Sequence, residues 1–487
     1  MLTAGNTYSG ATTIAAGTLQ IGDGGTTGAI GSTSGISISN GATLAFNRSD
    51  SYGGNFTRTI SGAGGLVLSN GTLTLQNTNN SFTGGVTVNG GKFQTLGNSA
   101  GSNIVVNSGG TFAMAGTDTW GSAGISTSPA VTINSGGTMT SDGRFNTLRN
   151  LTLNGGTVDL NGGLASAGAF VLGGTVTAGG ATTSTISASS GANNFIRLGR
   201  ETVVGGVTEF NVTDTAGQLS VGVELADNFG ASTAGLTKSG SGKMALSAVN
   251  TYTGATTVNA GLLKVLSGGS ISSSSTTVNS GGTLDVDGTA GSVQVNSGGL
   301  LKGSGSVGAF TLASGGNLNP GNSPGTLTAA SAIVLGGSTY NWEISALTGS
   351  AGTTWDLLSV GGLLDMSGVT SANKWNLVVT GDSGFTGWTD TSSYSYVFAQ
   401  AASVSGFSSA VGTDVTSLFN ITTSGIASKP NASFNANGEF KVLVGSGTDG
   451  NGNQITTLNL MAVPEPSSGS LLLAGLLVLQ AVRRKRA

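Results

Sequence analysis

A short pattern that returns at a fixed interval constrains the fold of this chain more than any other feature. Residues 278–284 read VNSGGTL, residues 295–301 read VNSGGLL and residues 312–318 read LASGGNL, so the pattern returns every 17 residues. Looser copies occupy residues 106–112, 133–139 and 153–158. A constant period is the signature of a repeat protein, in which each unit packs against its neighbours.

Each unit reads as two short strands joined by a turn. Side chains alternate between the two faces of a strand, so Val293 and Val295 share one face. The Ser-Gly-Gly segment that follows is a turn, because glycine reaches positive φ without steric cost. Stacked units would align two buried columns, which are Leu284, Leu301 and Leu318, and Val278, Val295 and Leu312. The sequence therefore predicts an all-β fold, a right-handed parallel β-helix over residues 1–330.

A second, longer repeat carries an aromatic residue between an asparagine and a glycine. Its copies start at Asn6, Asn80 and Asn250. The aromatic residues are Tyr8, Phe82 and Tyr252, and each precedes the second apolar anchor by 11 residues. We expect them to pack in the core or in turns. A ligand-stacking role is the alternative.

These residues resemble a known bacterial family. The segment 236–266 is similar to the autotransporter-associated β-strand repeat, and further copies lie near 2–22 and 66–96. The segment 303–327, with the core NPGNSPGTL at 319–327, resembles a companion motif of such proteins. The resemblance covers residues 1–330 in patches. It implies a β-helical stalk displayed on the cell surface, and it implies no enzymatic activity.

Composition narrows the chemistry that this chain can perform. The 487 residues contain no cysteine and no histidine, and only 8% are charged. Thiol nucleophiles, disulfides, Cys/His zinc sites and imidazole bases are thereby excluded. The formal net charge is −3, without the basic stripe that nucleic-acid binding needs. We expect no catalytic residues, no cofactor and no metal. The 86 glycines alone would also suit a flexible linker, but 37% hydrophobic residues argue against disorder.

The composition changes after residue 330. Four of the five tryptophans follow at Trp342, Trp355, Trp375 and Trp388, and the 17-residue period ends. We interpret 331–461 as a terminal β-region that caps the solenoid or forms a small β-sandwich, since an uncapped coil exposes unpaired backbone groups. Asp356, beside Trp355, is expected to be an exposed acid next to packing aromatics.

The C-terminal segment 462–487 has three parts in order. Val463, Pro464, Glu465 and Pro466 precede an apolar run at 469–482, and Arg483, Arg484, Lys485 and Arg486 follow it. As a helix the run would span about 21 Å, short of a hydrocarbon core of about 30 Å. This tail resembles the PEP-CTERM sorting signal, which implies recognition by an exosortase, a transient stay in the inner membrane with the basic end in the cytoplasm, and cleavage. An ordinary short anchor is the alternative.

The start of the chain lacks the secretory signal peptide that an exported protein needs. We expect that the true N-terminus lies upstream.

These observations favour a non-enzymatic structural or adhesive protein of the cell surface or extracellular matrix, whose partners include exopolysaccharide or sister rods. A β-helical protein that binds or degrades polysaccharide is the alternative; its candidate acids would be Asp285 and Asp287, on one outward strand face, and Asp356 and Asp365. A self-translocating autotransporter is not favoured, because the chain ends in an apolar run and RRKR. The segment 449–453, DGNGN, reads as a plain turn, with a calcium turn as the alternative.

Overall fold

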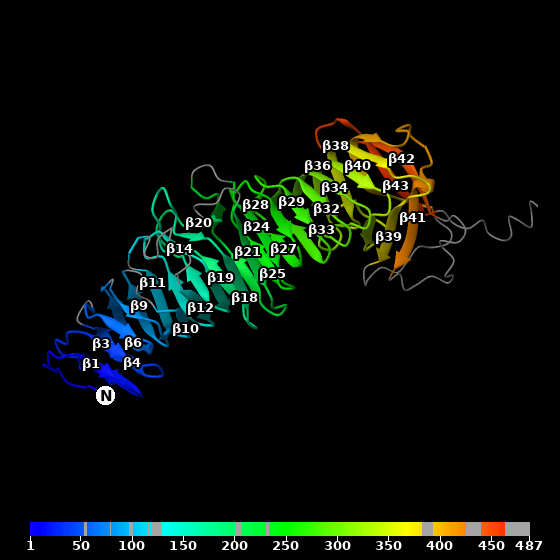
Figure 1. Cartoon of the computed structure of the whole chain (residues 1–487). Helices are drawn as coiled ribbons and strands as arrows, with labels where there is room; N and C mark the ends of the chain where they lie inside the picture. The colour runs from blue at the N-terminus through cyan, green and yellow to red at the C-terminus, as the bar shows by residue number, and fades with distance from the viewer. Residues whose placement is uncertain are drawn as a thin grey trace, which may run out of the picture. The chain divides into compact units, whose positions relative to one another are not determined.

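The computed structural model is built almost entirely from short β-strands (Figure 1). It describes residues 1–52, 56–77, 79–96, 101–114, 116–117, 129–199, 206–229, 233–381, 393–424 and 440–462. The chain divides into two compact units, 1–293 and 294–487, which are described separately. In the described part no helix is long and apolar enough to cross a membrane. The tail 463–487, with its predicted apolar helix 469–482, lies outside the described residues, as does Trp388.

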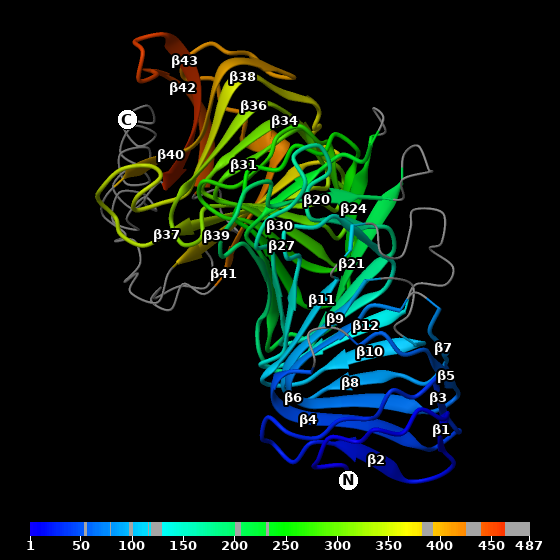
Figure 2. The ribbon, with the colours of Figure 1, turned by 90° about the vertical axis from the view of Figure 1, so that its left-hand side faces the viewer.

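The first unit consists of coils whose strands pair in parallel with the equivalent strand of the next coil. One ladder of paired strands comprises β2 (Thr18–Ile21), β4 (Thr43–Ser51), β6 (Gly65–Leu75), β9 (Gly91–Thr95), β11 (Gly110–Met114), β13 (Thr138–Thr140), β16 (Thr157–Asp159), β19 (Ser184–Ser187), β22 (Gln218–Val221), β25 (Lys243–Leu246), β27 (Gly261–Val265) and β30 (Gly282–Val286). A second ladder, which branches from β6, comprises β8 (Val86–Val88), β10 (Asn103–Val106), β12 (Ala130–Asn134), β15 (Leu151–Asn154), β18 (Thr175–Gly179), β21 (Val207–Val212), β24 (Gly235–Ser239), β26 (Thr256–Val258) and β29 (Thr276–Val278). Figure 2 shows β8, β10 and β12 as successive rungs.

Additional strands occupy a third side of some coils. They are β1 (Thr12–Ile14), β3 (Ile36–Ile38), β5 (Ile60–Gly62) and β7 (Ser81–Phe82), then β14 (Asn146–Leu148), β17 (Phe170–Leu172), β20 (Phe195–Leu198) and β23 (Glu224–Ala226), and β28 (Ser270–Ile271) with β31 (Thr289–Ala290). Each set pairs in parallel. The coils at β14–β23 are long: Arg197 bonds to residues 30 positions away in both directions. The sequence repeats did not predict these additional strands, because their coils do not keep a constant length.

The core of the first unit is made of columns of apolar side chains. Leu263 stands over Leu284 in the register of β27 and β30, and both are fully buried. Phe93 and Phe112 stack in β9 and β11 with ring centroids 5.9 Å apart. Alternation along each strand sends one residue inward and the next outward, and parallel pairing puts equivalent inward residues in contact. The stacked coils and buried columns that the repeat predicts are confirmed; the handedness remains a prediction.

The second unit continues the parallel pairing well past residue 330. Its strands are β33 (Leu300–Gly303), β35 (Asn317–Pro320), β37 (Thr339–Ile344), β39 (Trp375–Gly381) and β41 (Phe419–Ser424) in one ladder, and β34 (Ser306–Leu312), β36 (Thr326–Leu335), β38 (Leu357–Gly368) and β40 (Tyr394–Ser405) in the other. β32 (Val293–Val295) lies at the division between the units. The column Leu301, Leu318, Tyr340, Leu377 and Ile421 follows the first ladder rung by rung.

Antiparallel pairing ends this stack. β43 (Gln454–Ala462) pairs antiparallel with both β40 and β42 (Phe440–Thr448). The far edge of β42 bonds to the segment before the short 3₁₀ turn η1 (Thr416–Leu418), through Val415 N–H to the carbonyl of Val442. These strands occupy an edge that would otherwise expose unpaired N–H and C=O groups, as a cap requires. The domain boundaries predicted at 330 and 461 stay predictions.

The three tryptophans of this region that the structure describes are core residues. Trp342 and Trp375 are fully buried and Trp355 is nearly so. Trp375 packs against Tyr340 and Phe419, with centroids 5.6 and 5.7 Å apart. Larger side chains thus fill the wider coils in which the 17-residue period is lost.

Candidate functional site

The asparagine that opens the long repeat ties neighbouring coils together. Asn250 accepts a hydrogen bond from the Leu225 N–H at 2.9 Å and donates to the Ser270 carbonyl at 2.9 Å. Asn80 accepts from the Ile60 N–H at 2.7 Å, and Asn6 donates to the Ala29 carbonyl at 2.7 Å. An amide both donates and accepts, so one side chain can satisfy two backbone groups at a corner. The asparagine therefore has a structural role in all three copies.

The aromatic residue of the repeat forms a chemically matched pair with the residue four positions later. The hydroxyl of Tyr252 bonds to Thr256 Oγ1 at 2.7 Å, and that of Tyr8 bonds to Thr12 at 2.9 Å. In the remaining copy, Phe82 has no hydroxyl and the fourth residue is the apolar Val86. A buried hydroxyl needs a hydrogen-bond partner. The tyrosines are accordingly paired with threonine, and the phenylalanine is paired with valine.

The predicted packing role holds best for two of the three aromatics. Tyr252 and Phe82 are buried, whereas Tyr8 is 39% exposed. Burial raises the pKa of Tyr252 to about 12.

A ladder of asparagine side chains runs along the second ladder of the first unit. Asn107 donates to Asn89 at 2.7 Å, Asn134 donates to Asn107 at 2.7 Å, and Asn154 donates to Asn134 at 3.0 Å. These residues include the asparagine of the short VNSGG pattern and its looser copies. Each amide bridges one strand spacing, so the bonds stiffen the stack along its axis.

Lys238 lies inside the first unit rather than on its surface. It is fully buried in β24, in a column between Phe210 and Val258. Its Nζ donates to the carbonyls of Ser239 and Gly240 at 2.8 Å and to that of Ala260 at 3.1 Å. Burial lowers the pKa of Lys238 to about 8. The alternation Leu236-Thr-Lys238 carried this signal, since it places the lysine on the same face as the leucine.

The acids that the enzyme alternative invoked are held by local partners. Asp285 points away from the leucine column, as predicted, but neighbouring coils cover it to 2% exposure. Lys264 Nζ lies 3.1 Å from its Oδ2 and 2.7 Å from Oδ2 of Asp287. Asp365 accepts hydrogen bonds from Ser405 and Ser367, which lower its pKa. The described residues bring no three acidic side chains together in a metal-binding group.

The Asp449 carboxylate of the predicted turn is likewise engaged. It accepts bonds from the backbone N–H groups of Asn451 and Asn453 and from the Asn453 side chain. This geometry is that of a turn closed by its own side chain.

The prediction that Asp356 is an exposed acid is wrong. It is 3% exposed, because β37 and the loop after β35 close over it. Its Oδ1 accepts from the Gly325 N–H and its Oδ2 from the Glu343 N–H, each at 2.9 Å. The Trp342 indole N–H donates to its carbonyl at 2.7 Å. Burial raises the pKa of Asp356 to about 7, and the two N–H groups oppose that rise.

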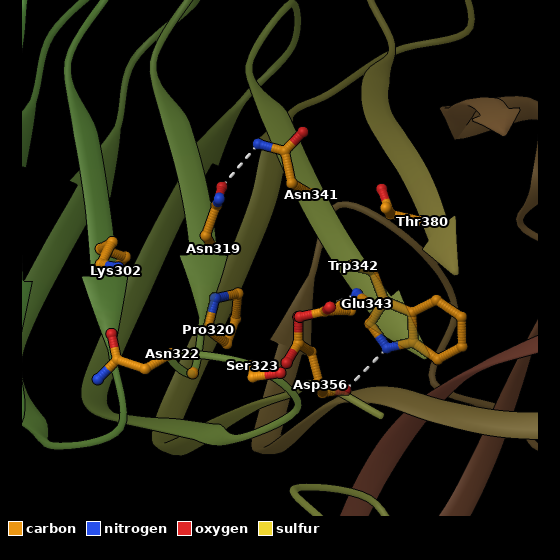
Figure 3. A pocket seen from close by; sticks show the side chains of 11 residues that line it. Lys302, Asn319, Pro320, Asn322, Ser323, Asn341, Trp342, Glu343, Asp356 and Thr380 are labelled. Atoms are coloured by element: carbon orange, nitrogen blue, oxygen red, sulfur yellow. Dashed lines mark hydrogen bonds between the residues drawn. The ribbon is translucent and has the colours of Figure 1, made fainter. Parts of the chain in front are cut away.

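A pocket of about 280 Å³ opens beside this aspartate (Figure 3). Its walls come from β33, β35, β37 and β39 and the loop 321–323, so part of the NPGNSPGTL motif lines it. The lining residues are Lys302, Asn319, Pro320, Gly321, Asn322, Ser323, Asn341, Trp342, Glu343, Asp356 and Thr380. The sequence indicated the motif but not the pocket, because the other lining residues come from β33 before the motif and from β37, Asp356 and β39 after it.

The residues predicted for sorting lie outside the described part of the chain. They are Val463, Pro464, Glu465, Pro466, Arg483, Arg484, Lys485 and Arg486. Their role stays a prediction.

Comparison with known proteins adds one family and one distant structure. The model of the passenger-associated-transport-repeat matches residues 1–21, 69–94 and 236–265, the same three places at which the long repeat occurs. No curated protein matches the chain significantly. The crystal structure of a TibA fragment, hyper-glycosylated in a reaction catalysed by TibC, is 19% identical over 77% of this chain and 95% of that fragment, with a TM-score of 0.25. Three segments of the chain are therefore similar to the passenger-associated transport repeat.

Proposed function

We propose that this chain is a non-enzymatic, exported structural or adhesive protein of the cell surface or extracellular matrix. The observation that carries the proposal is the coincidence of the three matched repeats with stacked coils. Their recurring asparagine, aromatic residue and glycines serve corners and packing. Because the side chains of these repeats bond to and pack against one another, the repeats form a structural scaffold. The polar groups on its outer surface can contact other molecules.

The delivery route belongs to the same proposal. The Val463–Pro466 motif, the apolar run 469–482 and the basic end form a sorting signal that an exosortase-type enzyme recognises and cleaves. The inner membrane would hold the chain only transiently. The support is the order of the three parts and a run too short for a comfortable span.

Protease treatment of intact cells that produce the full chain tests the location. Peptides from residues 1–462 should be released into the medium, while a cytoplasmic marker protein stays intact. If the chain is digested only after lysis, the proposed location is wrong.

A polysaccharide lyase or hydrolase is the second candidate function. Such enzymes need carboxylates that are free to transfer protons or to attack. Asp285 and Asp287 share Lys264, and both oxygens of Asp356 already accept backbone bonds. These contacts favour the non-enzymatic proposal. Turnover of any glycan in a panel of acidic and neutral polysaccharides, lost in Asp356→Asn, would favour the enzyme instead.

A further inference from the structure

The pocket beside Asp356 carries a rigid grid of polar side chains on the outside of the second unit. Lys302 and Asn319 are register partners on β33 and β35, and Asn341 Nδ2 donates to Asn319 Oδ1 at 2.6 Å. Glu343 lies on the same strand face as Asn341 and pairs with Thr380. Since neighbouring strands are about 4.8 Å apart, donors and acceptors stand at fixed intervals across the pocket wall.

Hydrogen bonds to neighbouring segments hold the loop that closes one side of the pocket. Asp356 joins the Gly325 N–H of the loop to the Glu343 N–H of β37. Gly321 also exchanges backbone bonds with Gly303 on β33, at 2.8 and 3.3 Å. The loop is therefore held in place before any ligand arrives, which reduces the ordering cost of binding.

We propose that this pocket binds one neutral pyranose unit of an extracellular polysaccharide. Amide, ammonium, carboxylate and hydroxyl groups together offer the donors and acceptors that adjacent sugar hydroxyls require. Because Lys302 and Glu343 bring opposite charges to the same pocket, the site favours a neutral ligand over a polyanion or polycation. About 280 Å³ lies just below the ~300–1,000 Å³ of typical small-molecule sites, which suits a ligand as small as one sugar ring.

This inference names the partner of the proposed surface function and rests on it. The test is saturation-transfer NMR and calorimetry of the full chain with glucose, galactose, mannose and N-acetylglucosamine, and with neutral oligosaccharides built from them. We expect at least one sugar to bind with a millimolar dissociation constant. Glu343→Gln and Asn341→Ala should each weaken binding tenfold or more.

Asn420→Ala is the matched control. Asn420 makes the same type of side-chain bond, to Asn376 at 2.9 Å, but does not line the pocket. It should leave binding unchanged, and circular dichroism should show all three variants folded. Binding of no sugar by the wild-type chain, or equal binding by Glu343→Gln and Asn341→Ala, would overturn the inference. Either result leaves the surface location to be decided by protease treatment of cells.

Discussion

Two copies of the long repeat carry a glycine at the same place. Replacing each by alanine distinguishes the effect of close packing on stability from the effect of backbone flexibility. Gly254 and Gly10 both lie four residues after the repeat asparagine. A methyl group at Gly254 would overlap the backbone carbonyl of Ala234 in the preceding coil, whereas at Gly10 it would meet no atom within 4 Å. Neither glycine has a positive φ, so alanine is free of dihedral strain at both positions.

The expected magnitudes differ in sign. Forcing a methyl group into a closed contact costs about 1–3 kcal/mol, because the coils must separate locally. At an open position the same change stabilises by about 0.4–1 kcal/mol, since alanine restricts the unfolded chain. Gly254→Ala should therefore be less stable than Gly10→Ala by about 1.5–4 kcal/mol.

Hydrogen exchange read by mass spectrometry is the appropriate assay, because coils of a repeat protein can open locally. Gly254→Ala should speed exchange in peptides from 234–265, while Gly10→Ala leaves peptides from 2–38 as slow as in the wild type. A second pair adds backbone strain to the same comparison: Gly17 and Gly261 have φ of 70° and 64°, so strain should cost alanine about 1–2 kcal/mol at both. At Gly17 the methyl group meets no atom within 4 Å, whereas at Gly261 it would overlap the carbonyl oxygens of Gly240 and Gly242, so Gly261→Ala should cost a further ~1–3 kcal/mol. Equal effects of Gly10→Ala and Gly254→Ala would refute the reasoning from close packing.

Three further predictions concern buried polar groups. Lys238→Met should lower stability by about 1–3 kcal/mol at pH 7, because three carbonyls lose their donor. The folded pKa of Lys238 is about 8, below an unfolded value of about 10.4, so the stability of the wild type relative to this variant should rise from pH 8 to 10.5. Denaturant midpoints measured across this pH range test the prediction. The control is Lys243→Met at an exposed position, which should show neither effect. The pKa of Asp356 in the folded chain is about 7, above its unfolded value of about 3.9. The stability of the wild type relative to Asp356→Asn should therefore fall as the pH is raised from 4 to 7. A difference in thermal midpoint between the two proteins that stays constant with pH would contradict this. Tyr252→Phe and Thr256→Val should each lower stability by about 1 kcal/mol, because each leaves the other hydroxyl without this partner. The double variant should cost less than the sum, because it removes both hydroxyls of the bond. Additive effects in a double-mutant cycle would show that the two residues are independent.

Periodic packing was readable from the sequence because it depends on local spacing. The repeat of 17 residues placed Leu301 under Leu318, and the structure pairs them. The period also indicated Val278, Val295 and Leu312 as buried, which they are. A column is visible in the sequence only while its coils keep a constant length.

The rest could not be predicted, because its contacts join residues at irregular distances. Asn376 and Asn420 bond across 44 residues, and Ser338 and Asn376 across 38. The burial of Asp356 depends on Gly325, 31 residues earlier, and no local pattern announces it. The pocket shares this origin: its motif was conspicuous in the sequence, but residues of the later strands β37 and β39, together with Asp356, complete it.

Mapping the C-terminus of the native protein tests the central claim most directly. Mass spectrometry would be applied separately to the chain recovered from the membrane and from the extracellular fraction. The account predicts an extracellular form that ends near Val463–Pro466 and lacks residues 471–486. If the chain is found only in the inner membrane with Arg483–Arg486 still attached, the claim of a sorted surface protein is contradicted.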